Sequence, residues 1–176
     1  MSFQWSVPDG WGDETIQFPL PFAPDLPYRG TEELRFMPGW AKPGAADHWS
    51  YVFAWWLEGS MPPEEAAITA DLASYYAGLC AAVAGESAVA DPDGHRVGLR
   101  RVGAAVRAGH QVQRFDGTAD LVDAFAGGEA MTLNLRLETW ACPIASHVAV
   151  LIAASRTLDE ATWERLLAQA GEFACH

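Results

Sequence analysis

Three polar residues beside the most aromatic stretch of the chain are the first candidates for acid–base chemistry. Asp47 and His48 come directly before this stretch, and Glu58 ends it. A carboxylate can orient a neighbouring imidazole as a general base, and a second carboxyl group can serve as the acid. Ordinary polar side chains in the loops at the two ends of a strand explain the same residues. The three residues therefore support a hypothesis, that of a small hydrolase or transferase.

Cysteine and histidine offer a second route to catalysis. Cys142 lies beside Pro143, and His147 follows five positions after Cys142. A nucleophilic cysteine needs an oriented base within hydrogen-bond reach, but nothing in the sequence indicates an orienting group or an oxyanion hole. A packed or disulfide-bonded cysteine is the alternative. In an oxidising compartment, Cys142 and Cys175 could pair.

Metal and nucleotide chemistry find no support in the spacing of residues. The histidines and the three cysteines match no metal-ligand pattern such as HExxH, so we expect no metal and no cofactor. The sequence also lacks GxSxG, GxGxxG and GxxxxGK[ST]. This removes the nucleophile-elbow hydrolases and the ordinary nucleotide-binding fingerprints.

The charge of the chain limits its partners. The formal net charge is −12, from 23 acidic and 11 basic residues, and such a surface repels nucleic acids and anionic lipids. No run of about 18 apolar residues predicts a membrane span. The N-terminus lacks the basic and apolar regions of a signal peptide, so we expect a cytoplasmic location.

The aromatic stretch, residues 48–59, predicts the central strand of the fold. It holds five aromatic residues within eight positions and is apolar on both faces of an extended strand. Burying five aromatic side chains at about 25 cal/mol per Å² corresponds to a gross gain of roughly 20–30 kcal/mol before entropy. We expect segments 96–107 or 131–140 to pair with it, under the helix that follows it.

The remaining elements are predicted from proline content and apolar spacing. Residues 1–47 hold seven prolines, which indicates an extended arm with short strands. After Gly59, apolar residues at helical spacing predict a helix of about 20 residues, and Thr157–Glu160 resembles a capping box before a terminal helix. Residues 118–126 fit either a helical turn or a strand. Further strands are expected at 96–107, 110–116, 131–140 and 147–154.

These elements predict a single α+β domain over residues 1–176, with the proline-rich arm at 1–47 and the main body at 48–176. Hairpin-linked neighbours favour an antiparallel sheet of about five to seven strands, with two helices packed on one face. The cleanest strand, 131–140, alternates apolar and polar residues, which is typical of a sheet with one solvated face.

Several segments resemble an uncharacterised bacterial protein family with no assigned function. The similar segments are Glu14–Leu20, Tyr28–Gly39 and Ser50–Gly59, together with Asp123–Phe125, Thr132–Asn134 and Cys142–Pro143. The resemblance implies an intact domain and transfers no catalytic residue. Some members of that family carry export signals, and in such members it implies a disulfide between the equivalents of Cys142 and Cys175.

Three functions follow from these observations. The first is a non-catalytic binding or protein-interaction domain, in which an aromatic-rich groove or sheet face takes an unknown protein or a small apolar ligand. Trp11, Trp40 and Trp49 are the candidate ligand contacts, and a homodimer is a further option. The second is the small enzyme built on Asp47, His48 and Glu58. The third is an acidic inhibitor or immunity-type protein for a basic partner.

Overall fold

The computed structural model describes residues 3–84 and 95–175. In these residues nine strands and two α-helices follow one another along the chain, with one short 3₁₀ turn at Pro143–Ala145. The strands are β1 (Phe3–Gln4), β2 (Gly12–Gln17), β3 (Gly30–Phe36), β4 (Tyr51–Glu58), β5 (Arg96–Arg107), β6 (His110–Val122), β7 (Ala130–Cys142), β8 (His147–Ser155) and β9 (Ala174–Cys175). The helices are α1 (Glu65–Ala84) and α2 (Glu160–Gly171).

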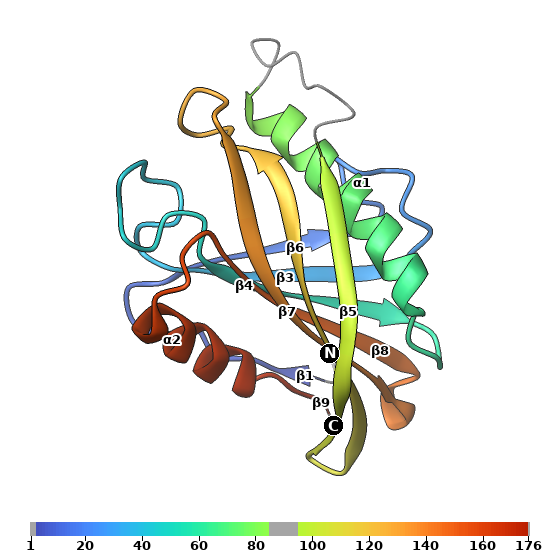
Figure 1. Ribbon diagram of the computed structural model, residues 1–176. Coiled ribbons are helices and arrows are strands. Elements are labelled where there is room, and N and C mark those ends of the chain that lie inside the picture. Colours follow the sequence, from blue (N-terminus) through green and yellow to red (C-terminus); the bar gives the residue numbers. More distant parts are fainter. Residues whose placement is uncertain (1–2, 85–94, 176) are drawn as a thin grey trace.

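Seven of the strands form one antiparallel sheet, in the order β2-β3-β4-β8-β7-β6-β5, and the fold is α+β as expected (Figure 1). The aromatic strand β4 lies inside the sheet, but its neighbours are β3 and β8. The expectation that it pairs with 96–107 or 131–140 was therefore wrong. Residues 118–126 continue β6 as far as Val122 and then turn.

The two helices lie on opposite faces of the sheet, which corrects the expectation that both cover one face. On one face, Tyr51, Phe53 and Trp55 of β4 share a buried apolar cluster with residues of α1. On the other face, the intervening side chains of β4 pack in a second cluster with Trp163 and Leu166 of α2. Figure 1 shows α1 and α2 on the two sides of the strongly twisted sheet.

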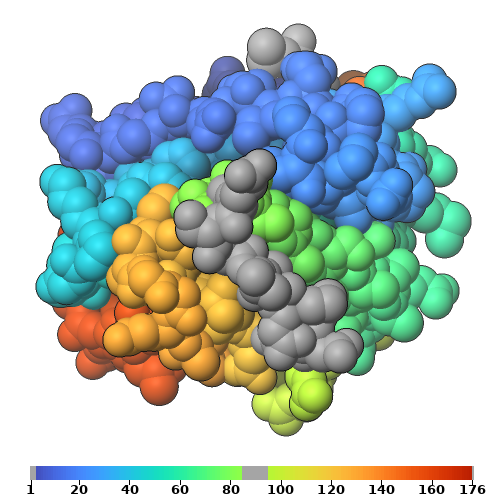
Figure 2. All heavy atoms as spheres, turned by 90° about the horizontal axis from the view of Figure 1, so that it is seen from above, coloured from blue at the N-terminus to red at the C-terminus, as the bar shows by residue number. Residues whose placement is uncertain are grey.

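Much of the proline-rich arm belongs to the main sheet and its covering layer. Strands β2 and β3 extend the sheet beyond β4. The segment between them packs on α1 so closely that a Cβ atom at Gly78 would lie 1.9 Å from the carbonyl oxygen of Phe22. Figure 2 shows this N-terminal segment, in blue, lying against α1, in green.

Helix α1 is long and apolar enough, by length and composition, to cross a membrane, with a mean hydropathy of 1.3. The core helices of soluble proteins pass the same test. Here Ile68, Leu72 and Tyr76 are buried against the sheet. The absence of a membrane span stays a prediction from the sequence.

Helix α2 begins two residues later than its sequence pattern indicates. Its N-cap is Asp159, whose carboxylate accepts hydrogen bonds from the backbone and the hydroxyl of Thr162 at 2.9 and 3.0 Å. The expected cap, Thr157, instead accepts from the Asp159 backbone N–H at 3.1 Å. An aspartate cap satisfies the same unpaired N–H groups of the first turn as a threonine would.

Candidate ligand groove beside the second helix

The structure does not assemble Asp47, His48 and Glu58 into an acid–base site. Asp47 accepts a hydrogen bond from the Gly39 backbone N–H at 3.0 Å and so fastens its own loop. Glu58 is exposed at the far end of the eight-residue β4. At about 3.3 Å per residue, the length of that strand separates Glu58 from Asp47 and His48 by roughly 20 Å. The hydrolase or transferase built on these three residues is therefore withdrawn.

His48 instead belongs to a buried network centred on Asp123. Its Nε2 lies 2.8 Å from Asp123 Oδ2, and its Nδ1 lies 2.9 Å from the Trp40 carbonyl oxygen. Both partners are acceptors, so both bonds form only when the ring carries two protons. Trp49 Nε1 donates to Asp123 Oδ1 at 2.9 Å, and Arg156 Nη1 donates to Oδ2 at 3.1 Å.

Asp123 is ionised and fully paired in this network. Burial of its carboxyl group opposes ionisation, but hydrogen bonds from Trp49 and His48, together with the His48 charge, lower the pKa of Asp123 below its ordinary value. The backbone N–H groups of Phe125 and Ala126 also donate to Oδ1. With neither nitrogen of His48 free, the network joins the loop before β4 to the loop after β6. Figure 2 shows these two loops, cyan and orange, side by side.

The three candidate tryptophans do not surround one cavity. Trp49 is completely buried, so its ring is not accessible to a ligand. Trp40 is half-buried and stacks on Phe36 with 4.1 Å between ring centroids. Trp11 lies on the other face, where the Arg165 guanidinium lies 5.8 Å from the centre of its ring. All three rings pack against the protein's own core.

A groove does exist on the face that carries α2. Helix α2 contacts mainly β8 and β4, and among residues 3–84 and 95–175 no helix covers the β5–β6 side of this face. The cavity at this boundary has a volume of about 560 Å³. We call it the α2 groove. Leu167 and Ala170 of α2 form one wall, Leu151 and Ala153 of β8 contribute to the floor, and Val102, Val106 and Arg107 of β5 form the opposite wall.

Two of the arginines that line the α2 groove are held by Glu138 of β7. Arg107 Nη1 and Arg114 Nε each donate to this carboxylate at 2.8 Å. Arg107 also donates to the carbonyl oxygens of Ala170 and Phe173 at the end of α2. These bonds tie the β5–β6 hairpin to the helix, so the two walls of the groove are fixed relative to each other.

The third arginine of the groove, Arg136, is positioned by an aromatic ring and not by a carboxylate. Its guanidinium lies 4.6 Å from the centre of the Trp163 ring, an arrangement that holds the planar group against an aromatic surface. No hydrogen bond or ion pair to Arg136 is found among the residues that the structure describes. Asp116 is its cross-strand neighbour and also lines the groove. With three arginines against Asp116 and Glu138, the groove is a locally basic part of an acidic protein.

The exposed edges of the groove are apolar. Val102, Val106 and Leu167 are 45%, 67% and 40% exposed, respectively. Most large apolar side chains of this chain are buried, so three accessible ones around one cavity form a distinct surface. The groove therefore combines an available guanidinium with an apolar rim.

Sequence reasoning missed the α2 groove although one of its signals was visible. The polar face of residues 131–140, which includes Arg136 and Glu138, indicated a solvated sheet face. Trp163 lies on a helix that was expected to cover the opposite face. The stacking of Arg136 on Trp163 joins residues 27 positions apart, and no local pattern links them.

The structure joins Cys142 and Cys175 in a disulfide, the pairing that the sequence tied to an oxidising compartment. The bond links the end of β7 to β9, and β9 in turn pairs with β1. Cys80 is a free cysteine, buried in α1.

Comparisons with known proteins do not assign the chain to a family. No protein-family model matches it, and no curated protein does. The solution structure of cyanobacterial PsbP (CyanoP) from Synechocystis sp. PCC 6803 is similar over 99% of this chain and 93% of that one, at 10% identity and a TM-score of 0.47. The crystal structure of LpqN, involved in cell envelope biogenesis of Mycobacterium tuberculosis, is similar over 97% and 78%, at 16% identity and a TM-score of 0.39. Likeness at these TM-scores assigns no function.

Proposed function

We propose that this protein is a non-catalytic binding domain whose α2 groove takes an amphiphilic anion, a molecule that carries an acidic head on an apolar body. The observation that carries the proposal is Arg136, whose guanidinium stacks on Trp163 while its N–H groups have no partner among the described residues. A guanidinium offers paired donors that match a carboxylate, sulfonate or phosphate.

The apolar rim of the α2 groove supports the apolar body of the proposed ligand. Val102, Val106 and Leu167 stand close enough to the arginine to line the same cavity. Removing their exposed surface from water would add about 25 cal/mol per Å² of apolar area buried. A purely apolar ligand would leave the Arg136 guanidinium unpaired, and a purely ionic ligand would leave the apolar rim exposed. An amphiphile satisfies both.

Two fluorescent probes test the proposal because they share a skeleton and differ in charge. Anilinonaphthalene sulfonate carries a sulfonate, and N-phenylnaphthylamine is the same apolar body without it. We expect the sulfonate probe to bind the folded protein more tightly than the neutral one. Arg136→Gln should weaken the sulfonate probe about tenfold, the loss of one charge-assisted contact of about 1.4 kcal/mol, and leave the neutral probe unchanged.

Arg165→Gln is the matched control. Arg165 also lies over a tryptophan ring, that of Trp11, but it does not line the groove. Its loss should leave the affinity for both probes as in the unsubstituted protein. Equal effects of the two arginine substitutions, or a neutral probe that binds as tightly as the sulfonate, would contradict the proposal.

A further inference from the structure

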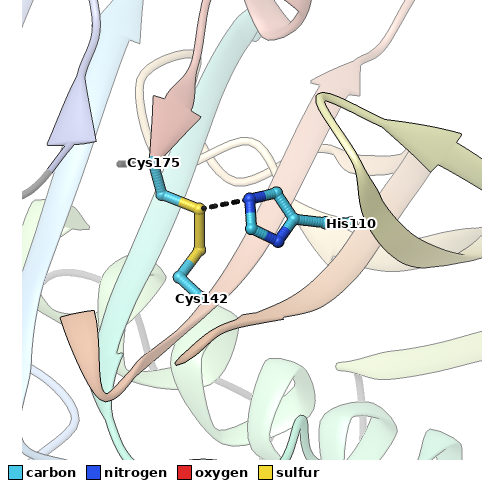
Figure 3. Close-up of side chains that lie close together, drawn as sticks. All are labelled: His110, Cys142 and Cys175. Atoms are coloured by element: carbon cyan, nitrogen blue, oxygen red, sulfur yellow. Dashed lines mark hydrogen bonds between the residues drawn. A yellow bond between two sulfur atoms is a disulfide. The ribbon is translucent and has the colours of Figure 1, made fainter. Parts of the chain in front are cut away.

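Three side chains with metal-binding atoms meet at the corner where the chain ends. His110 begins β6, Cys142 ends β7 and Cys175 lies in β9. One ligand atom from each, the histidine nitrogen and the two sulfurs, lies within 4.8 Å of the others. Figure 3 shows the imidazole of His110 pointing at the disulfide, with Nε2 3.6 Å from Cys175 Sγ.

These donors suit a borderline divalent cation better than any alkaline-earth ion. Thiolate sulfur and imidazole nitrogen are the ligands that Zn²⁺ prefers, and the geometry is tetrahedral. Two thiolates on one zinc ion, each about 2.3 Å away, lie roughly 3.8 Å apart. The Cα atoms of Cys142 and Cys175 are 6.3 Å apart. Side-chain rotation can therefore move the two sulfurs from a bonded pair to a metal-bound pair.

One N–H donor already lies at a sulfur that would bind the metal. Both cysteines are buried, and Trp140 Nε1 donates to Cys175 Sγ at 3.3 Å. A donor aimed at a ligand sulfur is the kind of outer contact that orients a metal ligand. Zn²⁺ with two thiolates and a neutral imidazole has no net charge, so burial of the complex carries little desolvation cost.

We propose that reduction of the Cys142–Cys175 bond converts this corner into a zinc site, with His110 Nε2 and the two sulfurs as ligands and solvent as the fourth. A phosphine reductant breaks the S–S bond, donates two electrons and becomes the phosphine oxide, while water supplies the oxygen and the two thiol protons. Zn²⁺ then displaces both thiol protons. Disulfide and metal exclude each other because they use the same sulfur atoms.

A metal site would stabilise this corner in the cytoplasmic location expected from the N-terminus, and the disulfide would stabilise it in an oxidising compartment. In an oxidising compartment the disulfide holds β9 to β7. In a cytoplasmic location the thiols would stay reduced, and zinc would hold the same strands together. The corner is thereby stabilised by one crosslink or the other.

Cobalt serves as the spectroscopic probe for this site. The experiment uses the Cys80→Ala background, which leaves only Cys142 and Cys175, before and after reduction with a phosphine. We expect the reduced protein to bind one equivalent of Co²⁺, with the ligand-field and sulfur charge-transfer bands of a tetrahedral thiolate site. Zn²⁺ should displace the cobalt, and the oxidised protein should show no such bands.

Two histidine substitutions identify the nitrogen ligand. His110→Asn should weaken Co²⁺ binding more than about tenfold, since the loss of even an outer contact costs that much. His147→Asn is the control, because His147 pairs with Cys142 across the sheet yet stacks on Trp56 at 4.8 Å and lies outside the cluster. Equal binding by the two variants, or the same bands in the oxidised protein, would overturn the proposal.

Circular dichroism shows whether the reduced protein stays folded, and the proposal makes a separate prediction for each case. A reduced protein that stays folded must show the cobalt bands. A reduced protein that loses structure must regain it when Zn²⁺ is added, because the metal then supplies folding free energy. Failure of the bands in the first case, or of the recovery in the second, rejects the site.

Discussion

Charged groups are buried on the face covered by α1 but exposed around the α2 groove on the other face. On the face covered by α1, Asp123 and Glu32 are fully buried, and both accept hydrogen bonds from tryptophan N–H groups. On the face that α2 partly covers, Arg114 and Arg136 are exposed. The difference follows from coverage: α1 and the N-terminal segment seal the first face, whereas α2 leaves the groove open, although the second face also buries the Glu33–Arg35 pair on β3. Stability should reside on the first face and binding on the second.

The largest difference in stability between the two faces is expected at Asp123. Asp123→Ala should lower the free energy of unfolding by about 3–5 kcal/mol, because it leaves the His48 ring and the Trp49 N–H buried without their acceptor. Urea unfolding followed by tryptophan fluorescence measures the change. Asp116→Ala, at an exposed carboxylate of β6 on the other face, is the control and should cost less than about 0.5 kcal/mol. Similar losses for the two variants would remove the distinction between the faces.

Substitutions of two leucines, one on each face, compare the faces at uncharged side chains. Leu135 is buried under α1, whereas Leu167 is 40% exposed at the α2 groove. Leu135→Ala should cost about 2–5 kcal/mol through lost burial and a cavity. Leu167→Ala should change the free energy of unfolding by less than about 1 kcal/mol and weaken both naphthalene probes instead. Thermal denaturation and probe titration, run on the same samples, would show whether the two effects separate in this way.

The buried carboxyl group of Glu32 gives the first face a pH dependence. Burial raises the pKa of Glu32 to about 8, whereas an unfolded glutamate titrates near 4.3. Between these values the folded protein holds a proton that the unfolded chain releases, so this residue lowers stability as the pH rises from about 4.3 to 8. Glu32→Gln should remove that slope, with a gain over the unsubstituted protein of up to a few kcal/mol at pH 8.

Denaturant midpoints at several pH values from 5 to 8 measure this slope, and the neighbouring Glu33 supplies its control. Glu33 lies on the opposite face of β3, where it accepts from the Thr15 hydroxyl at 2.9 Å and pairs with Arg35 at 3.8 Å. Glu33→Gln should keep the slope. A slope that survives in Glu32→Gln would assign the pH dependence to another group.

The smallest effect on stability is expected at the proposed ligand contact. Arg136→Gln should change the free energy of unfolding by less than about 0.5 kcal/mol, because the exposed guanidinium contributes only its contact with Trp163. The same substitution is expected to weaken the sulfonate probe about tenfold. Chemical denaturation would detect a larger loss, and such a loss would make Arg136 a structural residue of the second face.

The elements of the fold were predictable because their periodicity is local. The alternation of residues 131–140 predicted β7 and its solvated face, and the apolar spacing after Gly59 predicted α1. The face that each helix covers was not predictable. Because β4 is apolar on both sides, it offers either face to a helix, and its two-sided apolarity was itself the sign that both faces are covered.

The sites depended on contacts between distant residues and were correspondingly harder to predict. Asp47 is the sequence neighbour of His48, but the carboxylate that bonds the His48 ring is Asp123, 75 positions away. His110, Cys142 and Cys175 show no metal-ligand spacing because a separate strand contributes each of them. Spacing rules detect ligands that one helix, strand or turn carries, whereas these three side chains come from three different strands.

The pairing of β1 with β9 brings Phe3 opposite Cys175, so the two ends of the described chain lie side by side (Figure 1). Two fluorophores, one attached near each end, would lie within energy-transfer distance in the folded protein. Their separation would rise as soon as this two-residue ribbon opened, even with the seven-stranded sheet intact. The chain therefore contains a natural position for a reporter of local opening, independent of the signal from its eight tryptophans.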